Sequence, residues 1–462
     1  MKSWRRLATI LTVLAILAAA CGGGAGETTT TAGGGGTTQP GTDTTEGGTD
    51  TTGGEGAGEP IIAATSLPLT GEFSIPAQKH LDGYQLCVDL INERGGILGR
   101  EVVLEFEDNQ SDQEIAVTQY ERMVAEADIL FGTFSSLLTG PTSAIAEQNG
   151  MVYPVPSGGA QRIWERGFQN IFYFQARPAE GVGSAAVNAL LYYREQGLIS
   201  EEDYPETAAV VYADDPFAAA GRNGLAGGTV NDPATGDVLA DLAPGFLADA
   251  GIEIVFDRQW PVGFTDWTTF ANSIASSGAE SVWAATASVD EAISLIQALQ
   301  QVGHQPSFVW MSQGAQVEFR DALGDAANHI TMHTVWHPTV EFVGTLAGEE
   351  YTNQDFQADF EAVFGRAPDE DEAIPFAVCQ GMEQAIIGAG TTDNAAIAQW
   401  LRDRTVDDPV RTVLGDFHWD ERGLPIGRDY ILNQWQDGTL EFVFPVAPGL
   451  DTVDLVFPKA GW

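Results

Sequence analysis

Two short clusters of serine and glycine stand where this sequence could bind a polar ligand. Ser135 and Ser136 follow the apolar segment ADILFGTF, and Ser157, Gly158 and Gly159 follow the segment MVYPVP. Short side chains let backbone N–H groups approach an anion or another acceptor closely, and a helix that starts behind them adds partial positive charge. Ordinary strand-to-helix turns with N-caps use the same residue types. Both clusters are therefore candidate binding loops, with plain turns as the alternative.

Patterns for covalent catalysis and for metal binding are weak in this chain. The G-x-S-x-G motif of serine hydrolases is absent, and no lysine lies in a phosphate-loop or Schiff-base motif. His329, His333 and His337 recur every four residues, but the segment ITMHTVWHP is typical of a strand, so surface or hinge histidines are the favoured interpretation. We expect no catalytic residue, no metal and no cofactor.

Length and charge limit the classes of partner. A chain of 462 residues is too long for one core and predicts two or three lobes. The 65 acidic residues against 21 Lys and Arg give a net charge of −44. Such a surface repels phosphates and an anionic membrane leaflet, which excludes nucleic acid and polybasic membrane docking.

The N-terminal segment is typical of a secretion address. Lys2, Arg5 and Arg6 precede a short apolar run and three alanines, as in a signal peptide; a short membrane anchor is the alternative. Cys21 follows directly, and the stretch resembles a bacterial lipobox, although Leu17 stands one position early. We expect residues 1–21 to be a lipoprotein signal peptide and Cys21 to carry a lipid anchor. Residues 22–59, almost all Gly and Thr, predict a flexible linker.

From residue 60 onward, apolar strand patterns alternate with helical patterns. Expected strands occupy residues 61–67, 102–108, 127–135, 151–159, 208–215, 252–260, 281–288 and 307–314, and expected helices occupy 78–93, 114–127, 290–302 and a segment ending at 148. This order predicts an α/β fold with parallel sheets that helices cover on both faces. Ligands of such sheets bind beyond the carboxyl ends of the strands.

Several segments together resemble the type I periplasmic binding proteins, and within them the Leu/Ile/Val-binding branch that serves ABC importers. They are SLPLTGEFS, DGYQLCVDLINERGGILGREVVLEFEDNQSD, ILFGTFSS, GMVYPVPSGGAQRIWERGFQNIFYF, VVYADDPF and LGDFHWDERGLPIGRDYILNQWQDG. The resemblance implies two Rossmann-like lobes joined by a three-strand hinge. Lobe 1 would comprise residues 60–177 plus 338–412, and lobe 2 residues 178–337 plus 413–462. Hinge strands would lie near 174–178 and 334–338, and the lobes would close on ligand.

The resemblance also implies roles for individual residues. In this family the first lobe holds the carboxylate of the ligand, or an equivalent acceptor, which here falls to Ser135, Ser136 and the segment Ser157, Gly158 and Gly159. Phe73 would form an apolar wall of the pocket. From the second lobe, Phe217 stands where relatives stack a tyrosine, and Ser288 stands at another ligand-contacting position.

Gln313 departs from the family pattern. It stands where amino-acid-binding relatives use a glutamate to pair with the ammonium group of the ligand. Glutamine keeps a hydrogen bond but loses the charge, and a charge-assisted contact is about twice as strong as a neutral one. Either another acid, such as Glu180 or Asp215, supplies the pairing, or the ligand has no α-ammonium.

Cys87 and Cys379 lie on two expected helices of the same lobe. In an oxidising compartment they could form a disulfide that closes a very long loop; two buried free thiols are the alternative.

The sequence thus predicts the extracytoplasmic, lipid-anchored substrate-binding component of an ABC importer. We expect a monomer that captures a small polar solute, such as a branched-chain amino acid, an amide or a related small carboxylate, and delivers it to permease subunits. A ligand-binding sensor that feeds a membrane receptor, and less favoured an enzyme that uses the same cleft, are the alternatives.

Overall fold

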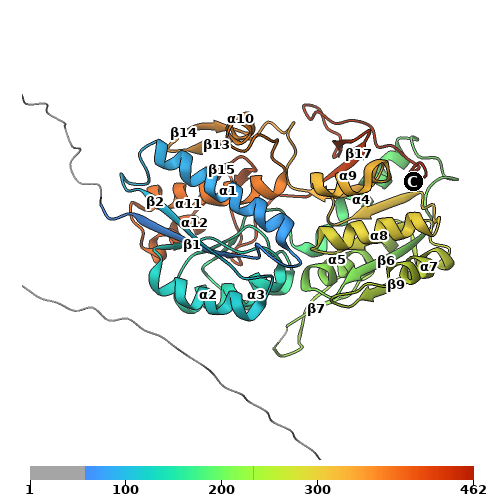
Figure 1. Ribbon diagram of the computed structural model, residues 1–462, viewed down its shortest axis with the longest axis horizontal. Helices are drawn as coiled ribbons and strands as arrows, with labels where there is room; N and C mark the ends of the chain where they lie inside the picture. Colours follow the sequence, from blue (N-terminus) through green and yellow to red (C-terminus); the bar gives the residue numbers. More distant parts are fainter. Residues whose placement is uncertain (1–57, 233) are drawn as a thin grey trace, which may run out of the picture. The chain divides into compact units, whose positions relative to one another are not determined.

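The computed structural model of the protein describes residues 58–232 and 234–462 (Figure 1). The predicted signal peptide, the lipobox with Cys21 and nearly all of the predicted linker at 22–59 lie outside the described residues. Within the described residues, no helix combines the length and the apolar composition that a membrane crossing requires.

Strands and helices alternate along most of the chain, as the sequence predicts. The strands are β1 (Ile61–Leu67), β2 (Val102–Asp108), β3 (Ile129–Leu130), β4 (Tyr153–Val155), β5 (Ile171–Tyr173), β6 (Thr207–Ala213), β7 (Thr229–Asn231), β8 (Val238–Asp241), β9 (Glu253–Trp260), β10 (Ser281–Ala285), β11 (Phe308–Met311), β12 (Thr331–Thr334), β13 (Val343–Leu346), β14 (Glu349–Thr352), β15 (Val410–Thr412), β16 (Gly415–Phe417), β17 (Ile431–Gln436) and β18 (Thr439–Phe444). The α-helices are α1 (Ser74–Glu93), α2 (Gln113–Glu126), α3 (Ser136–Gln148), α4 (Ser184–Glu195), α5 (Pro216–Ala226), α6 (Phe246–Asp249), α7 (Trp267–Ser277), α8 (Val289–Gln301), α9 (Val317–Leu323), α10 (Asn353–Phe364), α11 (Glu370–Ala389) and α12 (Asn394–Arg402). Short 3-10 helices are η1 (Gln161–Arg166), η2 (Ala179–Gly181) and η3 (Gly324–Ala327).

A parallel sheet in the order β2-β1-β3 forms the centre of the first lobe. The predicted strands at 61–67 and 102–108 have the predicted bounds, whereas the strand expected at 127–135 is only two residues long. The next pair, β4 and β5, continues this sheet through one hydrogen bond from Gly132 N–H to the carbonyl of Pro154. Pro154 and Pro156 offer no N–H to this ladder, which explains why it is so short.

The second lobe contains a seven-stranded sheet in the order β18-β17-β12-β11-β10-β6-β9. Strands β9, β6, β10, β11 and β12 are parallel, as the predicted α/β order implies, and the last two described strands, β17 and β18, join antiparallel. Figure 1 shows the two sheets in separate parts of the ribbon, each with helices beside it. Together the described parts form one compact unit, so the lobes are in contact.

The chain passes between the two sheet systems three times: between β5 and β6, between β12 and β13, and between β16 and β17. Two of these passages contain the expected hinge segments 174–178 and 334–338. The expected boundary between residues 412 and 413 falls inside the β15–β16 hairpin, in which Val410 pairs with Phe417. The third passage therefore follows β16.

Helices α1 and α11 pack side by side on the first lobe and are joined covalently. Cys87 of α1 and Cys379 of α11 form a disulfide, with Cα atoms 6.2 Å apart.

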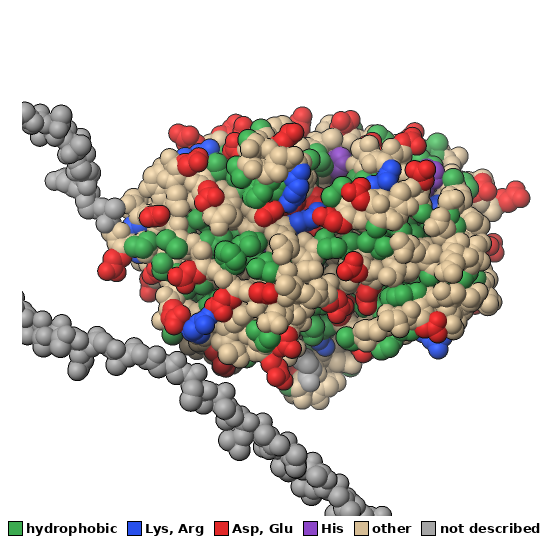
Figure 2. Space-filling view, in the orientation of Figure 1, with side chains coloured by type: hydrophobic (Ala, Val, Ile, Leu, Met, Phe, Trp, Pro, Cys, Tyr) green, Lys and Arg blue, Asp and Glu red, His purple; other side chains and the backbone are tan. Residues whose placement is uncertain are grey.

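The face of the molecule that Figure 2 shows carries scattered Asp and Glu side chains and fewer Lys and Arg side chains, in keeping with the net charge of −44.

Candidate functional site

The loop between β3 and α3 contains the first predicted binding cluster. Ser135 has a positive φ of 74°, which is uncommon and strained for a residue with a side chain. Its hydroxyl is buried and has no hydrogen-bond partner. Ser136 starts α3, and its hydroxyl accepts the N–H of Ala160 at 3.1 Å.

The second predicted cluster, Ser157 to Gly159 after β4, lies against the first. The N–H of Ser135 donates to Ser157 Oγ at 3.3 Å, and the hydroxyl of Thr139 donates to the carbonyl of Ser157 at 2.7 Å. Gly158 has φ 141°, and a Cβ there would lie 2.6 to 2.8 Å from Thr139 atoms, so only glycine fits. The backbone N–H groups of Gly158 and Gly159 donate to no protein acceptor within the described residues.

A cavity of about 40 Å³ lies in front of these loops, enclosed by side chains of both lobes. By its volume it holds roughly three waters, so the lobes are nearly closed on each other. Its lining residues are Phe134, Ser157, Gly158, Gly159, Tyr173, Gln175, Glu370, Asp371 and Ile374 from the first lobe, and Phe217, Ser312, Gln313, His333, Val335 and Tyr430 from the second lobe or the hinge. The carboxyl ends of the strands meet here, as expected for a ligand site of such sheets.

The structure thus brings five of the predicted ligand-binding residues to one cavity: Ser157, Gly158, Gly159, Phe217 and Gln313. Ser135 and Ser136 do not line it and lie behind the 157–159 loop, to which their hydrogen bonds connect them.

Two predicted residues lie away from the cavity. Phe73 is only 2% exposed, and its ring packs 6.0 Å from that of Phe134, which forms the wall instead. Ser288 is buried and serves as the N-cap of α8, where its hydroxyl accepts the N–H of Glu291. A serine directly before a helix is a common N-cap, and this local role accounts for its position.

Sequence reasoning missed the aromatic rings of the cavity and its two carboxylates. Tyr173, His333 and Tyr430 stand at or near the hinge passages, where position along the chain gives little sign of what they face. Glu370 and Asp371 open α11 within the run PDEDEAIPF. Acids ahead of an apolar helical run are the usual mark of a helix start, so this pattern alone does not indicate a ligand site.

The electrostatics of the cavity centre on Asp371, which is 5% exposed. Burial, followed by the charge of Asp369, raises the pKa of Asp371 to about 7. Burial and the neighbouring Asp371 also raise the pKa of Glu370, whose carboxylate accepts the N–H of Val335 at 3.0 Å. His333 is 8% exposed, its Nδ1 has no partner, and burial lowers its pKa to about 3, so its ring is neutral.

Glu180 and Asp215, the two acids that could replace the missing glutamate at position 313, form other hydrogen bonds. Glu180 accepts the N–H of Gln161 at 3.0 Å, and burial raises its pKa to about 7. Asp215 caps α5 by accepting the N–H groups of Phe217 and Ala218. Neither carboxylate lines the cavity.

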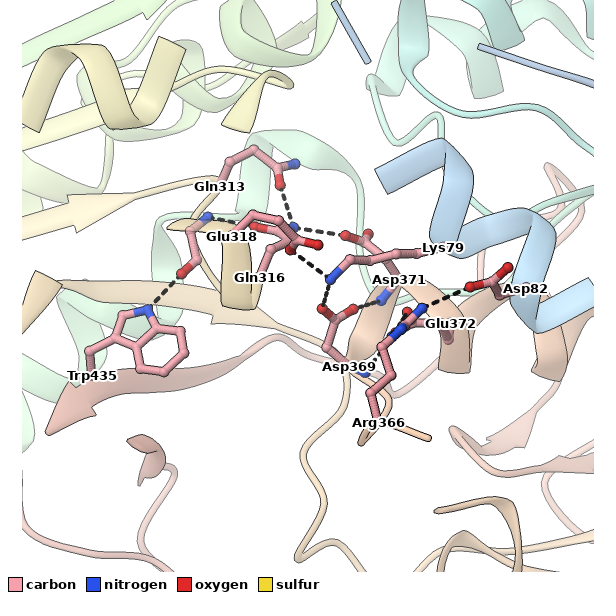
Figure 3. Close-up of polar contacts among 11 residues, drawn as sticks. Lys79, Asp82, Gln313, Gln316, Glu318, Arg366, Asp369, Asp371, Glu372 and Trp435 are labelled. Atoms are coloured by element: carbon pink, nitrogen blue, oxygen red, sulfur yellow. Dashed lines mark hydrogen bonds and ion pairs between the residues drawn. The ribbon is translucent and has the colours of Figure 1, made fainter. Parts of the chain in front are cut away.

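Polar contacts cross between the lobes beside the cavity (Figure 3). Gln316 Nε2 donates to Asp371 Oδ2 at 2.8 Å and to Gln313 Oε1 at 2.9 Å. Lys79 of α1, also buried, pairs with Asp369 of its own lobe and with Glu318 of the other lobe, the latter at 2.9 Å. These contacts hold the lobes together.

Lys79 and Arg366 border a second, larger cavity of about 380 Å³, which shares only Glu370 with the first. Both cations are already paired with acids, Lys79 as above and Arg366 with Asp82 and Glu372. The walls also include Trp336 and Trp435. None of the predicted binding residues faces this cavity, so the smaller one is the candidate functional site.

Comparison with known proteins supports this assignment of the fold. The Leu/Ile/Val-binding protein homolog 7 of Brucella suis is 22% identical over 395 residues, which cover 84% of this chain and 92% of that one. An amino acid binding protein of Pseudomonas aeruginosa is 23% identical, with 82% of this chain and 90% of that one covered.

Solved structures with the same fold carry different ligands. The branched-chain amino acid transporter substrate binding protein LivJ of Streptococcus pneumoniae, in complex with isoleucine, superposes with a TM-score of 0.67 at 18% identity, covering 86% of this chain and all of that chain (100%). A solute binding protein of an ABC transporter from R. palustris, in complex with benzoate, superposes with a TM-score of 0.65 at 19% identity, covering 83% and 95%. The family model described as periplasmic binding protein matches residues 60–228 and 229–439, and the chain therefore belongs to the periplasmic binding protein family.

Proposed function

We propose that this protein is the extracytoplasmic substrate-binding component of an ABC importer. Its cleft would capture a small polar solute, such as a branched-chain amino acid, an amide or a related small carboxylate, and membrane permease subunits would recognise the closed form. The observation that carries the proposal is the cavity that loops of both lobes close, with Ser157, Gly158 and Gly159 on one side and Phe217 and Gln313 on the other.

A closed cleft explains capture without chemistry. A ligand that contacts both lobes stabilises the closed form by the free energy of the contacts it makes only there. The described cavity holds unpaired N–H groups at Gly158 and Gly159 for an acceptor on the ligand. Lobe boundaries at the three passages, with the third after β16, would let the first lobe move as one body that the disulfide stiffens.

Binding can be measured by the thermal stability of the purified protein with single compounds. We would test L-leucine, L-isoleucine, acetamide, urea, benzoate and short amines at 1 mM. A ligand at 100 times its Kd adds about 2.7 kcal/mol to the free energy of unfolding. A compound that raises Tm should also bind in calorimetry, and Gly158→Ala should abolish that binding. Lack of a response to every compound class, or turnover of a bound compound, would contradict the proposal.

The proposal includes a lipid anchor at Cys21, which would hold the binding body at the outer side of the cell membrane as a monomer. Two acyl chains suffice for stable anchoring. We expect the native chain in the membrane fraction and Cys21→Ala in the soluble fraction, with mass spectrometry detecting the diacylglyceryl group only on the native chain. Equal partition of both would contradict the anchor.

A further inference from the structure

The Asp and Glu side chains that line the cavity have no Lys or Arg opposite them among the described residues. Glu370 and Asp371 are its acidic residues, and no Lys or Arg lines it within residues 58–232 and 234–462. The nearest basic groups of this region are committed elsewhere: Lys79 pairs with Asp369 and Glu318. A ligand in this cavity therefore meets two carboxylates and no counter-charge from the protein wall.

Asp371 has one side-chain hydrogen bond, although most of its side chain is buried. It is 5% exposed, and its one side-chain hydrogen bond comes from Gln316, to Oδ2. An uncompensated buried charge is costly, and a neutral amide on one oxygen compensates it only in part. The other oxygen, Oδ1, accepts no hydrogen bond within the described residues. A cation in the cavity would supply the missing partner.

The remaining walls suit a cation as well. The rings of Phe134, Tyr173, Phe217 and Tyr430 line the same space, and aromatic faces attract ammonium groups. His333 adds a neutral ring whose Nδ1 is buried and unpartnered, and its ring meets that of Tyr430 edge-on at 4.9 Å. His333 lines the same cavity as the two carboxylates, and its unpartnered nitrogen could bond to a polar group of a ligand there.

We infer that the solute carries a protonated amine or quaternary ammonium group, that Asp371 and Glu370 at the start of α11 are its counter-charges, and that this positive charge, rather than a carboxylate of the ligand, determines its affinity. The inference rests on the proposed capture of a small solute in this cleft and narrows its class. It also assigns charge recognition to Glu370 and Asp371 of the first lobe rather than to Gln313 of the second.

The test compares ligands that share a carbon skeleton and differ in charge. One set is isoamylamine, L-leucine and isocaproate; a second is benzylamine, phenylglycine and benzoate. We expect calorimetry to detect the amine and the amino acid of at least one set, with the acid at least ten-fold weaker. If the acid of a set binds best, the inference fails while the proposed function stands. If no member of either set binds, the proposed function itself fails for these solutes.

Single substitutions test which side chains supply the negative charge that pairs with the ligand. Asp371→Asn keeps the shape of the side chain and should weaken amine binding about ten-fold or more, since a hydrogen bond to a charged group becomes neutral. Glu370→Gln should weaken it in the same direction. Glu361→Gln, an exposed acid of α10 in the same lobe, is the matched control and should bind as the native protein does. Equal affinity in all three variants would overturn the assignment.

The pH dependence tests the native chain without substitution. The charged and polar groups that face Asp371 are Glu370 on its own helix, Asp369 at the N-cap of that helix, Lys79 of α1, and Gln316 and Glu318 at the start of α9. A pKa of about 7 for Asp371 means that its carboxylate protonates as pH falls from 8 to 5, while an alkyl ammonium stays charged. The affinity for an amine should therefore decrease as pH is lowered from 8 to 5. An affinity that increases as pH is lowered would overturn the inference.

Discussion

The ion pair between Lys79 and Glu318 gives the most direct test of how the lobes stay closed. We consider Glu318→Gln, which removes the charge on the second lobe and leaves Lys79 paired with Asp369. The Lys79 side chain is 5% exposed and that of Glu318 is 42% exposed; Glu318 Oε2, which faces Lys79, is itself buried, so water screens the pair only in part. A pair of this kind contributes about 0.5 kcal/mol and at most about 1 kcal/mol. The ratio of closed to open molecules should fall about two- to five-fold.

The assay follows closure and binding separately. Small-angle X-ray scattering of the ligand-free variant should show a larger radius of gyration than the native protein, and 1 M NaCl should shift the native protein the same way. Affinity for any ligand found in the screen should fall by no more than the same two- to five-fold, because an open population lowers the apparent affinity. Glu201→Gln is the control, since Glu201 pairs with Arg194 inside the second lobe. An unchanged radius and unchanged affinity would refute a role of this pair in closure.

Two further predictions concern stability. Replacement of Cys87 and Cys379 by alanine should lower the free energy of unfolding by about 2–5 kcal/mol, since the disulfide closes a sequence separation of 292 residues; guanidinium titration with and without reductant measures it, and an unchanged midpoint would contradict it. The ligand-free protein should become less stable as pH rises from 5 to 8, because burial raises the pKa of carboxyls such as Glu180 and Glu383 to about 7, above their unfolded values, so that the stability they contribute while protonated is lost on ionisation. Burial lowers the pKa of His333, and this has the opposite effect, because the unfolded chain binds a proton at this histidine below about pH 6.5 and the folded chain does not. A Tm that rises steadily from pH 5 to 8 would therefore contradict the dominance of the buried carboxyls.

Element order and several element bounds could be predicted from the sequence because the patterns are local. Strands 61–67 and 102–108 form as expected, since short segments rich in β-branched and other apolar residues, bounded by polar loops, leave few alternatives. Helix α1 begins at Ser74, four residues before the expected start, because the loop ahead of it is stabilised by tertiary contacts: Phe73 N–H donates to Ser111 Oγ. Ser111 is 38 residues from Phe73 in the sequence, so a local sequence pattern does not reveal this contact.

The candidate site likewise contains residues that the sequence predicts and residues that it does not. Gly158 and Gly159 are predicted as ligand-binding residues because close backbone approach requires glycine, a residue type that can be read directly from the sequence. Glu370 and Asp371 were not, because their part in the cavity depends on the packing of α1 against α11, which brings the 369–372 turn to the second lobe. Phe134 rather than the predicted Phe73 lines the cavity for a related reason: the two rings are packed against each other, and only tertiary packing decides which of them reaches the cavity.

Asp371 lies at the point where ligand charge and lobe closure meet. It lines the cavity, and it accepts the hydrogen bond from Gln316 that crosses between the lobes. While it is protonated, this contact is a neutral hydrogen bond; when a cation beside it favours the ionised form, the same contact becomes charge-assisted and about twice as strong. A cationic solute paired with Asp371 would therefore strengthen the hydrogen bond that Gln316 donates to the same carboxylate from the other lobe, whereas a neutral or anionic solute of equal size would not. Closure selective for charge follows from this single carboxylate, which is why its replacement should affect the compactness of the liganded protein as well as its affinity.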